Sequence, residues 1–290
     1  LSAPAALMNF GVTGWLIAMQ KTRIVLLLAF VVNGLNAILD VIFVIAFNMG
    51  VSGVAVGTLI AEWIACVIGL AIVFSTIRRI NSKISLSGIF QKSSFTLLFN
   101  VNLDIFLRTL SLTLSHLWFI NRSSTIGDLQ LAINGVLLNF HILTAFFIDG
   151  FAFTAETLVG ESKGARDFKL FREYVIASTF WCLLAGMFCS FIFGMFGSSM
   201  VGLLTDIASV NEKSGPYLMW IVILPIISAV GYQLDGIFLG ATQTSAMRNG
   251  MFISLLVLVG TSFYLVNNFG NHGLWASFVL FMITRCITLG

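Results

Sequence analysis

Long apolar stretches follow one another along the whole chain and are separated by short polar connections. Runs such as "IVLLLAFVV" and "FISLLVLVG" do not alternate between apolar and polar positions, so they predict helices rather than the strands of a membrane barrel. A helix needs about 20 mostly apolar residues to cross a bilayer. We therefore expect nine spanning helices, at about 3–19, 24–47, 51–77, 95–120, 129–160, 174–204, 217–239, 251–266 and 273–289.

Composition agrees with this pattern. The chain is 58% hydrophobic and 9% charged, with a mean hydropathy of +1.01, whereas a soluble domain carries about 25% charged residues. The sequence predicts an all-α integral membrane protein. It contains no phosphate-binding loop, no metal-ligand spacing and no nucleophile beside a base, so we expect neither an enzyme nor a bound cofactor or metal.

The basic residues alternate between the connections. The connections after the first, third, fifth and seventh spans hold Lys21, Arg23, Arg78, Arg79, Lys83, Lys92, Lys163, Arg166, Lys169, Arg172 and Arg248. The intervening connections hold only Arg122 and Lys213. By the positive-inside rule the basic connections are cytoplasmic. We read these charges as topology signals and expect no binding of nucleic acid.

Two stretches of the chain resemble each other at a shift of about 221 residues. "APAALMNFGVTGWLIAMQKT" and "LPIISAVGYQLDGIFLGATQT" share a proline, a glycine and a threonine in register, and Gly50 and Gly53 match Gly270 and Gly273. Such a repeat is typical of transporters built from parallel halves.

Three spans precede the second copy of this repeat, but none precedes the first. We therefore expect a fragment of a twelve-span protein that lacks the first three spans and the tip of the last. Residues 1–94 would be the last three helices of an N-lobe with the connection between lobes, and residues 95–290 the six-helix C-lobe, with its last helix cut short.

Several motifs together resemble one family. They are "NGLNAILDVIFV" with "GVSGVAVGT", "NLDIFLRTLSL", "DGFAFTAETLVGESKGARD" and "YQLDGIFLGATQTSAMRN". Over essentially the whole chain they resemble the multidrug and toxic compound extrusion family, and within it the DinF-like branch. An aspartate on the first N-lobe helix, linked to proton coupling in some members of that family, would lie upstream of Leu1.

The resemblance implies a two-lobe bundle of parallel six-helix repeats around a central cavity. It also implies alternating access, with export of small organic compounds, often cationic or amphipathic, in exchange for protons or sodium. We expect such a protein to act as a monomer in the bilayer of a bacterial inner membrane, with a small-molecule substrate as its partner.

Ten polar residues within the spans are candidates for ion coupling or substrate binding. A carboxylate in hydrocarbon costs roughly 2.5–3.5 kcal/mol, so such residues need a reason to be there. The candidates are Asn33, Asn36, Asp40, Asp104, Arg108, Asn134, Asn139, Asp149, Glu156 and Asp235. For each the alternative is a structural role, such as hydrogen bonding between helices.

The spacing of the acidic candidates suggests how they act. Asp149 and Glu156 are seven residues apart, which places them about 20° apart around one helix. Asp104 and Arg108 have the i, i+4 spacing of an ion pair. Asp235 has no basic neighbour in sequence and resembles the family's acidic residue on the fourth helix of the C-lobe. Asp104 and Asp235 are therefore the candidates for a sodium site, and we expect Asp104 and Asp149 to face one cavity.

Two other functions remain open. A flippase for a lipid-linked oligosaccharide, from the same superfamily, would line its cavity with several arginines for a pyrophosphate. Only Arg108 and Arg285 lie within the predicted spans, so the exporter is favoured. A truncated membrane protein that transports nothing is the third reading.

Overall fold

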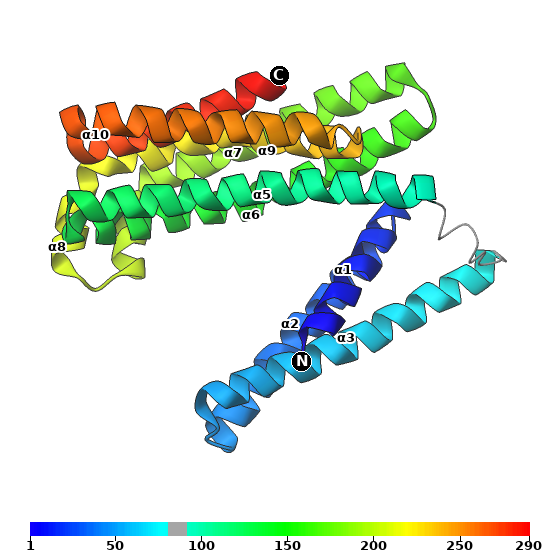
Figure 1. The fold of residues 1–290 in the computed structure, drawn as a ribbon. Coiled ribbons are helices and arrows are strands. Elements are labelled where there is room, and N and C mark those ends of the chain that lie inside the picture. The colour runs from blue at the N-terminus through cyan, green and yellow to red at the C-terminus, as the bar shows by residue number, and fades with distance from the viewer. Residues whose placement is uncertain (81–91) are drawn as a thin grey trace. The chain divides into compact units, whose positions relative to one another are not determined.

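The computed structural model describes residues 1–80 and 92–290, and this part of the chain is helical throughout, without a strand (Figure 1). The predicted basic connection from 78 to 92 falls largely outside the described residues. The helices are α1 (Ala3–Ala18), α2 (Thr22–Val41), the π-helix η1 (Ile42–Ala46), α3 (Gly50–Ile80), α5 (Lys92–Ile126), α6 (Asp128–Gly164), α7 (Phe168–Leu204), α8 (Ala208–Ser214), the 3-10 turn η2 (Gly215–Tyr217), α9 (Leu218–Gly240) and α10 (Thr244–Leu289).

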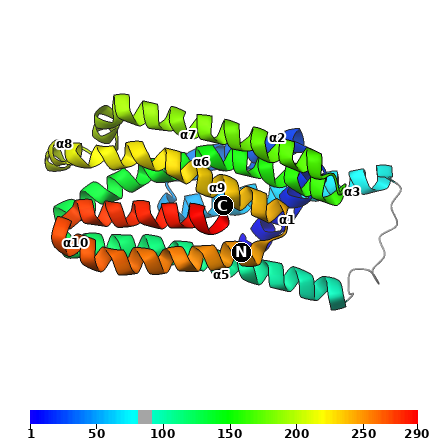
Figure 2. The same ribbon diagram turned by 90° about the horizontal axis from the view of Figure 1, so that it is seen from above.

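The helix count differs slightly from the nine expected spans. Seven helical segments of the described chain are long and apolar enough to cross a membrane, and α1 is shorter, with 16 residues. The predicted eighth and ninth spans are two arms of α10, which bends at Gly270 (φ 56°, ψ −131°). The arms lie side by side in both views (Figures 1 and 2). A Cβ on Gly250 would lie 2.7 Å from the hydroxyl of Thr288, so the arms run antiparallel.

The described chain separates into two compact units, Leu1–Ile89 and Phe90–Gly290. In the smaller unit, α1 and α2 both pack against α3. Its small core centres on Val12, Leu16 and Leu28. The ammonium group of Lys21 donates to the hydroxyl of Thr76 (3.0 Å) and ties the α1–α2 turn to α3. The assignment of the two units to lobes of a larger protein stays a prediction.

The larger unit has three tiers. Figure 2 shows α7 on one side, α5 and α10 on the other, and α6 and α9 between them, and the packing contacts agree. Aromatic rings fill the centre, where Phe119 meets Trp275 and Phe278 edge to face at 5.0 and 5.2 Å. This apolar core holds α5 against the second arm of α10.

The α6 and α9 backbones touch. A Cβ on Gly236 would lie 2.3 Å from the carbonyl oxygen of Ala152, and one on Gly240 would lie 2.3 Å from that of Glu156. Only glycine permits such an approach, and two glycines four residues apart allow it over a full turn. Both contacts have the same sequence offset, so the two helices run parallel in a fixed register.

Backbone conformations repeat at the shift seen in the sequence. The turns after α1 and α9 each end in a left-handed residue, Gln20 (φ 55°) and Thr242 (φ 55°), and the two turns form the same hydrogen bonds. Gly50 and Gly270 both have φ 56°. The internal repeat predicted from sequence is therefore present as repeated turn geometry in the described residues.

Candidate functional site

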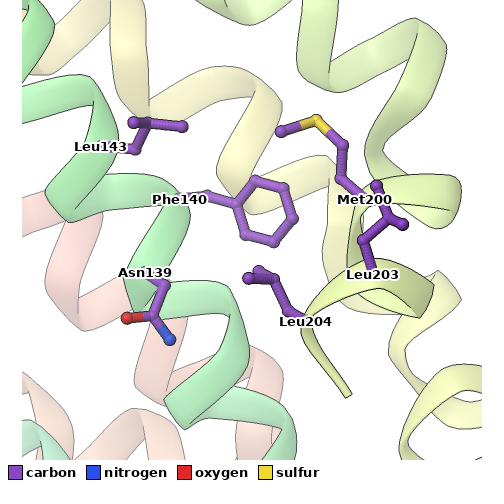
Figure 3. Close-up of a pocket in the computed structure, with 6 residues that line it drawn as sticks. All are labelled: Asn139, Phe140, Leu143, Met200, Leu203 and Leu204. Atoms are coloured by element: carbon purple, nitrogen blue, oxygen red, sulfur yellow. The ribbon is translucent and has the colours of Figure 1, made fainter. Parts of the chain in front are cut away.

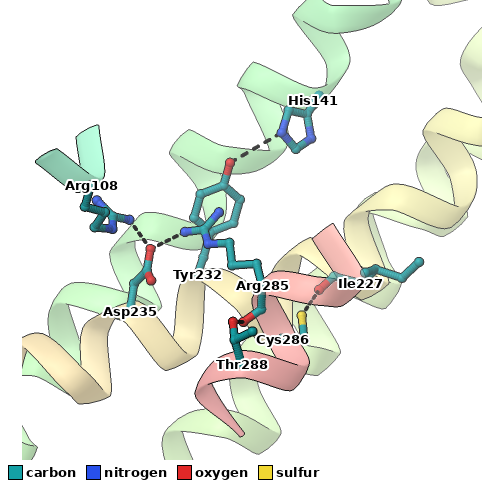
Figure 4. A network of polar contacts seen from close by, with 8 residues as sticks. All are labelled: Arg108, His141, Ile227, Tyr232, Asp235, Arg285, Cys286 and Thr288. Carbon is teal, nitrogen blue, oxygen red and sulfur yellow. Dashed lines mark hydrogen bonds and ion pairs between the residues drawn. The ribbon is translucent and has the colours of Figure 1, made fainter. Parts of the chain in front are cut away.

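A buried charge cluster lies inside the larger unit. Oδ2 of Asp235 on α9 accepts hydrogen bonds from the guanidinium groups of both Arg108 on α5 and Arg285 on α10 (Figure 4). The side chain of Arg285 is 0% exposed and that of Asp235 is 10% exposed. Oδ1 of Asp235 and Nε of each arginine have no partner among the described residues. One largely buried carboxylate thus binds two arginines.

Asp235 is therefore not the isolated carboxylate that its sequence neighbourhood suggests. Its partners lie 127 and 50 residues away along the chain. It also lies near the end of α9, five residues before Gly240, rather than in the middle of a span. Arg285 belongs to the site although it was not among the ten candidates. The available signal was an arginine inside an apolar run.

The expected pair between Asp104 and Arg108 is wrong. Asp104 instead binds the guanidinium of Arg248 (2.5 Å) and the hydroxyl of Thr244 (3.0 Å), both in the first turns of α10. Because α10 starts beside this part of α5, it supplies a cation closer to Asp104 than Arg108 is. Arg108 is then free to reach across to Asp235.

Asp149 on α6 joins the cluster without an ion pair of its own. The α6–α9 register places it level with Gln233, two residues from Asp235, or about 3 Å along the axis. It interacts electrostatically with Arg285, Arg108 and Asp235. Its side chain is half-buried and has no hydrogen bond within the described part of the chain. The expected cavity that joins Asp104 and Asp149 is not found among the described residues. The carboxylate of Asp104 instead binds side chains of α10.

Glu156 lies outside the cluster. Its backbone touches Gly240 at the end of α9, about 10 Å along α6 from Asp149. Its side chain is partly buried and forms no ion pair among the described residues. The two acidic residues thus share a side of α6, as their spacing predicts, but only Asp149 meets other charges.

The acidic and the basic residues of the cluster lie on different pairs of helices. Both carboxylates, Asp149 and Asp235, lie on α6 and α9, whose backbones touch. Both arginines, Arg108 and Arg285, lie on α5 and α10, which pack together. The ion pairs therefore join two helix pairs, and we call this contact the charged seam.

A line of polar groups runs from the seam into the aromatic core. The guanidinium of Arg285 lies 4.7 Å from the centre of the Tyr232 ring, and the Tyr232 hydroxyl lies 3.4 Å from Nε2 of His141 (Figure 4). The rings of His141 and His116 are 6.2 Å apart. Nδ1 of His141 is buried and has no partner in the described structure. Both histidines lie beside Phe278.

The side-chain amide of Asn134 has all of its hydrogen-bonding groups engaged within the protein. Its amide nitrogen donates to Ser123 (2.5 Å) and Asn271 (2.6 Å), and its oxygen accepts from Asn271 (3.0 Å) and Trp275 (2.8 Å). These bonds fasten α6 and α5 to α10 just after the bend at Gly270. With both donors and both acceptor sites engaged, Asn134 has no capacity left for a substrate.

Asn139 lines a cavity but does not offer it a polar group. The cavity, about 290 Å³, lies between α6 and the end of α7 and is walled by Phe140, Leu143, Met200 and Leu203 (Figure 3). The amide of Asn139 donates instead to the carbonyl of Gly135 on its own helix (3.0 Å). The named walls carry no charge, so this cavity suits an apolar occupant rather than ion exchange.

The three candidates of the smaller unit make separate contacts on one side of α2. Asn33 donates to the carbonyl of Ala29 (2.8 Å), and Asn36 donates to the hydroxyl of Thr58 on α3 (3.0 Å). Oδ1 of Asp40 is buried without a partner among the described residues. Asn33 and Asn36 thus have structural bonds, whereas Asp40 keeps a buried oxygen without a partner among the described residues.

Both proposed sodium positions are carboxylates that already bind arginine. Within residues 1–80 and 92–290, no group of three or more His, Cys, Asp or Glu side chains is arranged to hold a metal. The carboxylates of Asp104 and Asp235 are both bound to arginine. A sodium ion would have to displace a guanidinium at either one.

The chain is similar to known membrane transport proteins. A sequence model of the MatE family matches residues 105–264. The chain is 34% identical to DNA damage-inducible protein F of Escherichia coli (strain K12) over 293 residues, which are 100% of this chain and 63% of that protein. It is 26% identical to Protein DETOXIFICATION 42 of Arabidopsis thaliana, over 98% of this chain and 54% of that protein. The chain thus spans somewhat over half the length of these relatives.

Solved structures share the fold. An outward-facing multidrug resistance MATE family transporter of the MOP superfamily superposes with a TM-score of 0.87 at 19% identity, covering 97% of this chain and 64% of that one. A MOP superfamily transporter from Pyrococcus furiosus gives a TM-score of 0.87 at 19% identity, covering 99% and 65%. At this level of identity the likeness concerns the fold alone.

Proposed function

The chain belongs to the MatE family of transporters, and from that premise we propose that it works as part of a secondary antiporter that exports small organic compounds. The protein is a multi-pass integral membrane protein, and its family consists of transporters rather than enzymes. Beyond family membership, the proposal names the coupling reaction, the residues that carry it and the substrates. The substrates are small molecules that are often cationic or amphipathic.

The observation that carries the proposal is the carboxylate of Asp235 bound between two arginines inside the apolar unit. Replacing a buried ion pair by apolar side chains is often neutral or stabilising, by up to about 4 kcal/mol. A fold that only needed stability would therefore do without these charges. Charges that change partners during a transport cycle give a reason to keep them.

The charged seam suggests how ion entry drives a conformational change. A proton delivered to Asp235 removes its negative charge and releases an arginine. Asp149 lies at nearly the same level and has no partner in the described structure, so it is placed to receive that arginine. Because the acids and the arginines lie on different helix pairs, a change of partner alters the attraction between the pairs. Two packings of these pairs would then be the two states of the cycle.

This arrangement favours a proton over sodium as the coupling ion. A sodium ion would need several oxygen ligands at Asp235, where Oδ2 is already bound by two guanidinium groups. A proton needs a single oxygen, and Oδ1 of Asp235 is unused. Sodium at Asp104 or Asp235 is the second possibility. The flippase is disfavoured because both arginines of the cluster are bound to a carboxylate and so have less charge to offer a pyrophosphate.

The test is gradient-driven efflux from proteoliposomes with Asp235→Asn. The amide keeps the size of the side chain but cannot titrate, so we expect efflux to fall at least roughly tenfold, equivalent to about 1.4 kcal/mol. Asp206→Asn makes the same chemical change at an exposed position between α7 and α8 and should leave efflux unchanged. Asp235→Glu keeps the charge and should retain dependence on the gradient.

Folding is checked separately, because Asp235→Asn leaves two arginines without their carboxylate. The variant must elute as one species in size-exclusion chromatography before its rate is interpreted. A folded Asp235→Asn protein that exports at the normal rate, with the normal dependence on the pH gradient, would place coupling elsewhere.

A further inference from the structure

A second cavity lies at the end of the larger unit, where two turns meet. It has a volume of about 320 Å³, and its walls include Lys163, Arg166, Phe168, Phe171 and Gln243. The walls come from the turn between α6 and α7 and from the turn between α9 and α10. This end also carries the basic residues that the positive-inside rule assigns to the cytoplasm. The cavity therefore lies where headgroups meet the apolar part of the bilayer.

The two turns are held together by Lys163. Its ammonium group donates to the carbonyl of Ala241 and to the hydroxyl of Thr242 (2.8 Å). Each turn is also closed by its own backbone, at Arg166 and Thr242, which are both left-handed. The cavity thus has a fixed floor, and the ammonium group of Lys163 donates to the backbone and hydroxyl groups that form it.

Arg166 is the cation of the cavity wall whose donor groups are free to bind a ligand. Its side chain is exposed and has no hydrogen bond or ion pair within the described residues. The neighbouring Asp167, which also lines the cavity, caps α7 by accepting from the amide of Leu170 (3.0 Å) and forms no ion pair with Arg166 among the described residues. The first turn of α7 adds the positive end of the helix dipole on the same side.

Part of the cavity wall is aromatic. Phe168 is 79% exposed. Its ring stacks on that of Phe171, with centroids 6.1 Å apart and planes 9° apart. An exposed phenyl group at the end of a spanning helix is unfavourable in water but favourable against acyl chains. The cavity therefore combines an unpaired cation with an apolar face.

We propose that this cavity binds one anionic phospholipid. The guanidinium of Arg166 donates to the phosphate as a fork, the geometry in which arginine binds phosphate best. Phe168 and Phe171 pack against the start of an acyl chain. Because the walls join the ends of α6 and α9, the lipid also braces the helices that carry Asp149 and Asp235. The site stands independently of the coupling mechanism proposed above.

The experiment measures lipid binding to the purified protein by native mass spectrometry and thermal unfolding in detergent. The probes are phosphatidylglycerol, phosphatidylcholine with the same acyl chains, and inorganic phosphate. We expect phosphatidylglycerol alone to stay bound and to raise the unfolding temperature. Arg166→Gln should weaken its binding at least roughly tenfold, since it removes a charge-assisted hydrogen bond. Arg166→Lys should weaken it less.

Arg172→Gln is the matched control, because it removes one positive charge from the same end of α7 without touching the cavity wall. Equal losses with Arg172→Gln and Arg166→Gln would mean diffuse surface charge and would overturn the site. Equal binding of phosphatidylcholine would rule out recognition of the anionic headgroup. A full temperature shift with inorganic phosphate alone would mean an anion site and no lipid site. Phe168→Ser tests the aromatic part of the wall and should weaken phosphatidylglycerol binding although Arg166 is left in place.

Discussion

The guanidinium of Arg285 lies 4.7 Å from the centre of the Tyr232 ring and at the same time binds Asp235. Tyr232 and Asp235 are three residues apart on α9, so one face of that helix offers the arginine both a ring and a carboxylate. A fully buried guanidinium is costly, and the ring offsets part of that cost.

The ring and the hydroxyl of Tyr232 should have separable effects. Tyr232→Phe keeps the ring under Arg285 and should change the free energy of unfolding by about 1 kcal/mol or less. Tyr232→Leu removes the ring and should cost about 2 kcal/mol more. Thermal unfolding in detergent measures both. If the two variants lose the same stability, the hydroxyl bond to His141 matters and the cation–π contact does not.

Asp149 should become essential when Asp235 is lost. Each single change to asparagine leaves one carboxylate for the two arginines of the seam, whereas the double variant leaves none. We expect the double variant to lose more stability than the sum of the singles, with a coupling energy of about 0.5–3 kcal/mol.

A double-mutant cycle on the purified protein gives that number. Additive effects would show that Asp149 does not receive an arginine. Asp149→Glu is the useful companion, because it keeps the charge and should retain the coupling to Asp235 that Asp149→Asn removes.

Asp104 should be coupled to Arg248 and not to Arg108. The Asp104–Arg248 pair is partly exposed, with 13% and 35% of the two side chains accessible. A cycle of Asp104→Asn and Arg248→Gln should therefore give a coupling of about 1 kcal/mol or less. The corresponding cycle with Arg108→Gln should give none. Arg248→Gln should leave efflux intact, and a tenfold fall in efflux would assign Arg248 to the transport machinery.

Alanine should not be tolerated where α9 touches α6. In Gly236→Ala the new methyl group would meet the Ala152 carbonyl, so the helices must separate, at a cost of about 1–3 kcal/mol. Gly150→Ala is the matched control on α6, since a Cβ there meets nothing within 4 Å. We expect the control to be neutral or slightly stabilising. Equal unfolding temperatures for the two variants would contradict the backbone contact.

The amide of Asn134 should hold the bend of α10. Asn134→Ala leaves the side chains of Asn271 and Trp275 without buried partners, which costs about 1–3 kcal/mol. Asn139→Ala removes only a bond to its own helix and should cost far less. Hydrogen exchange around Gly270 reports the difference. Unchanged protection in Asn134→Ala would mean that the bend is held by packing alone.

Hydropathy predicts the helices well because in a bilayer an apolar run of sufficient length has few alternatives to a helix. The repeat can be recognised in the sequence because Gly50 and Gly270 both stand where the backbone has a positive φ, a conformation that favours glycine. The bend at Gly270 falls between the predicted eighth and ninth spans, although the two arms that it joins form one continuous helix.

The ion pairs could not be predicted in the same way. The i, i+4 spacing made Arg108 the obvious partner for Asp104, but tertiary packing brought Arg248 closer. Asp235 finds both of its partners on other helices, and no pattern within one helix encodes which helix will face it. Arg285 could have been suspected, because an arginine within a span almost always has a carboxylate or a cavity beside it.

The left-handed residues that close the turns leave room for engineering. Gln20 and Thr242 hold positive φ angles with a side chain present, where glycine would relieve about 1 kcal/mol of strain at each. Gln20 lies in the smaller unit, whereas the hydroxyl of Thr242 accepts a hydrogen bond from Lys163 in the larger unit. Glycine at Gln20 is therefore the change to try for a more stable protein in purification and crystallisation, whereas glycine at Thr242 would also remove the bond from Lys163.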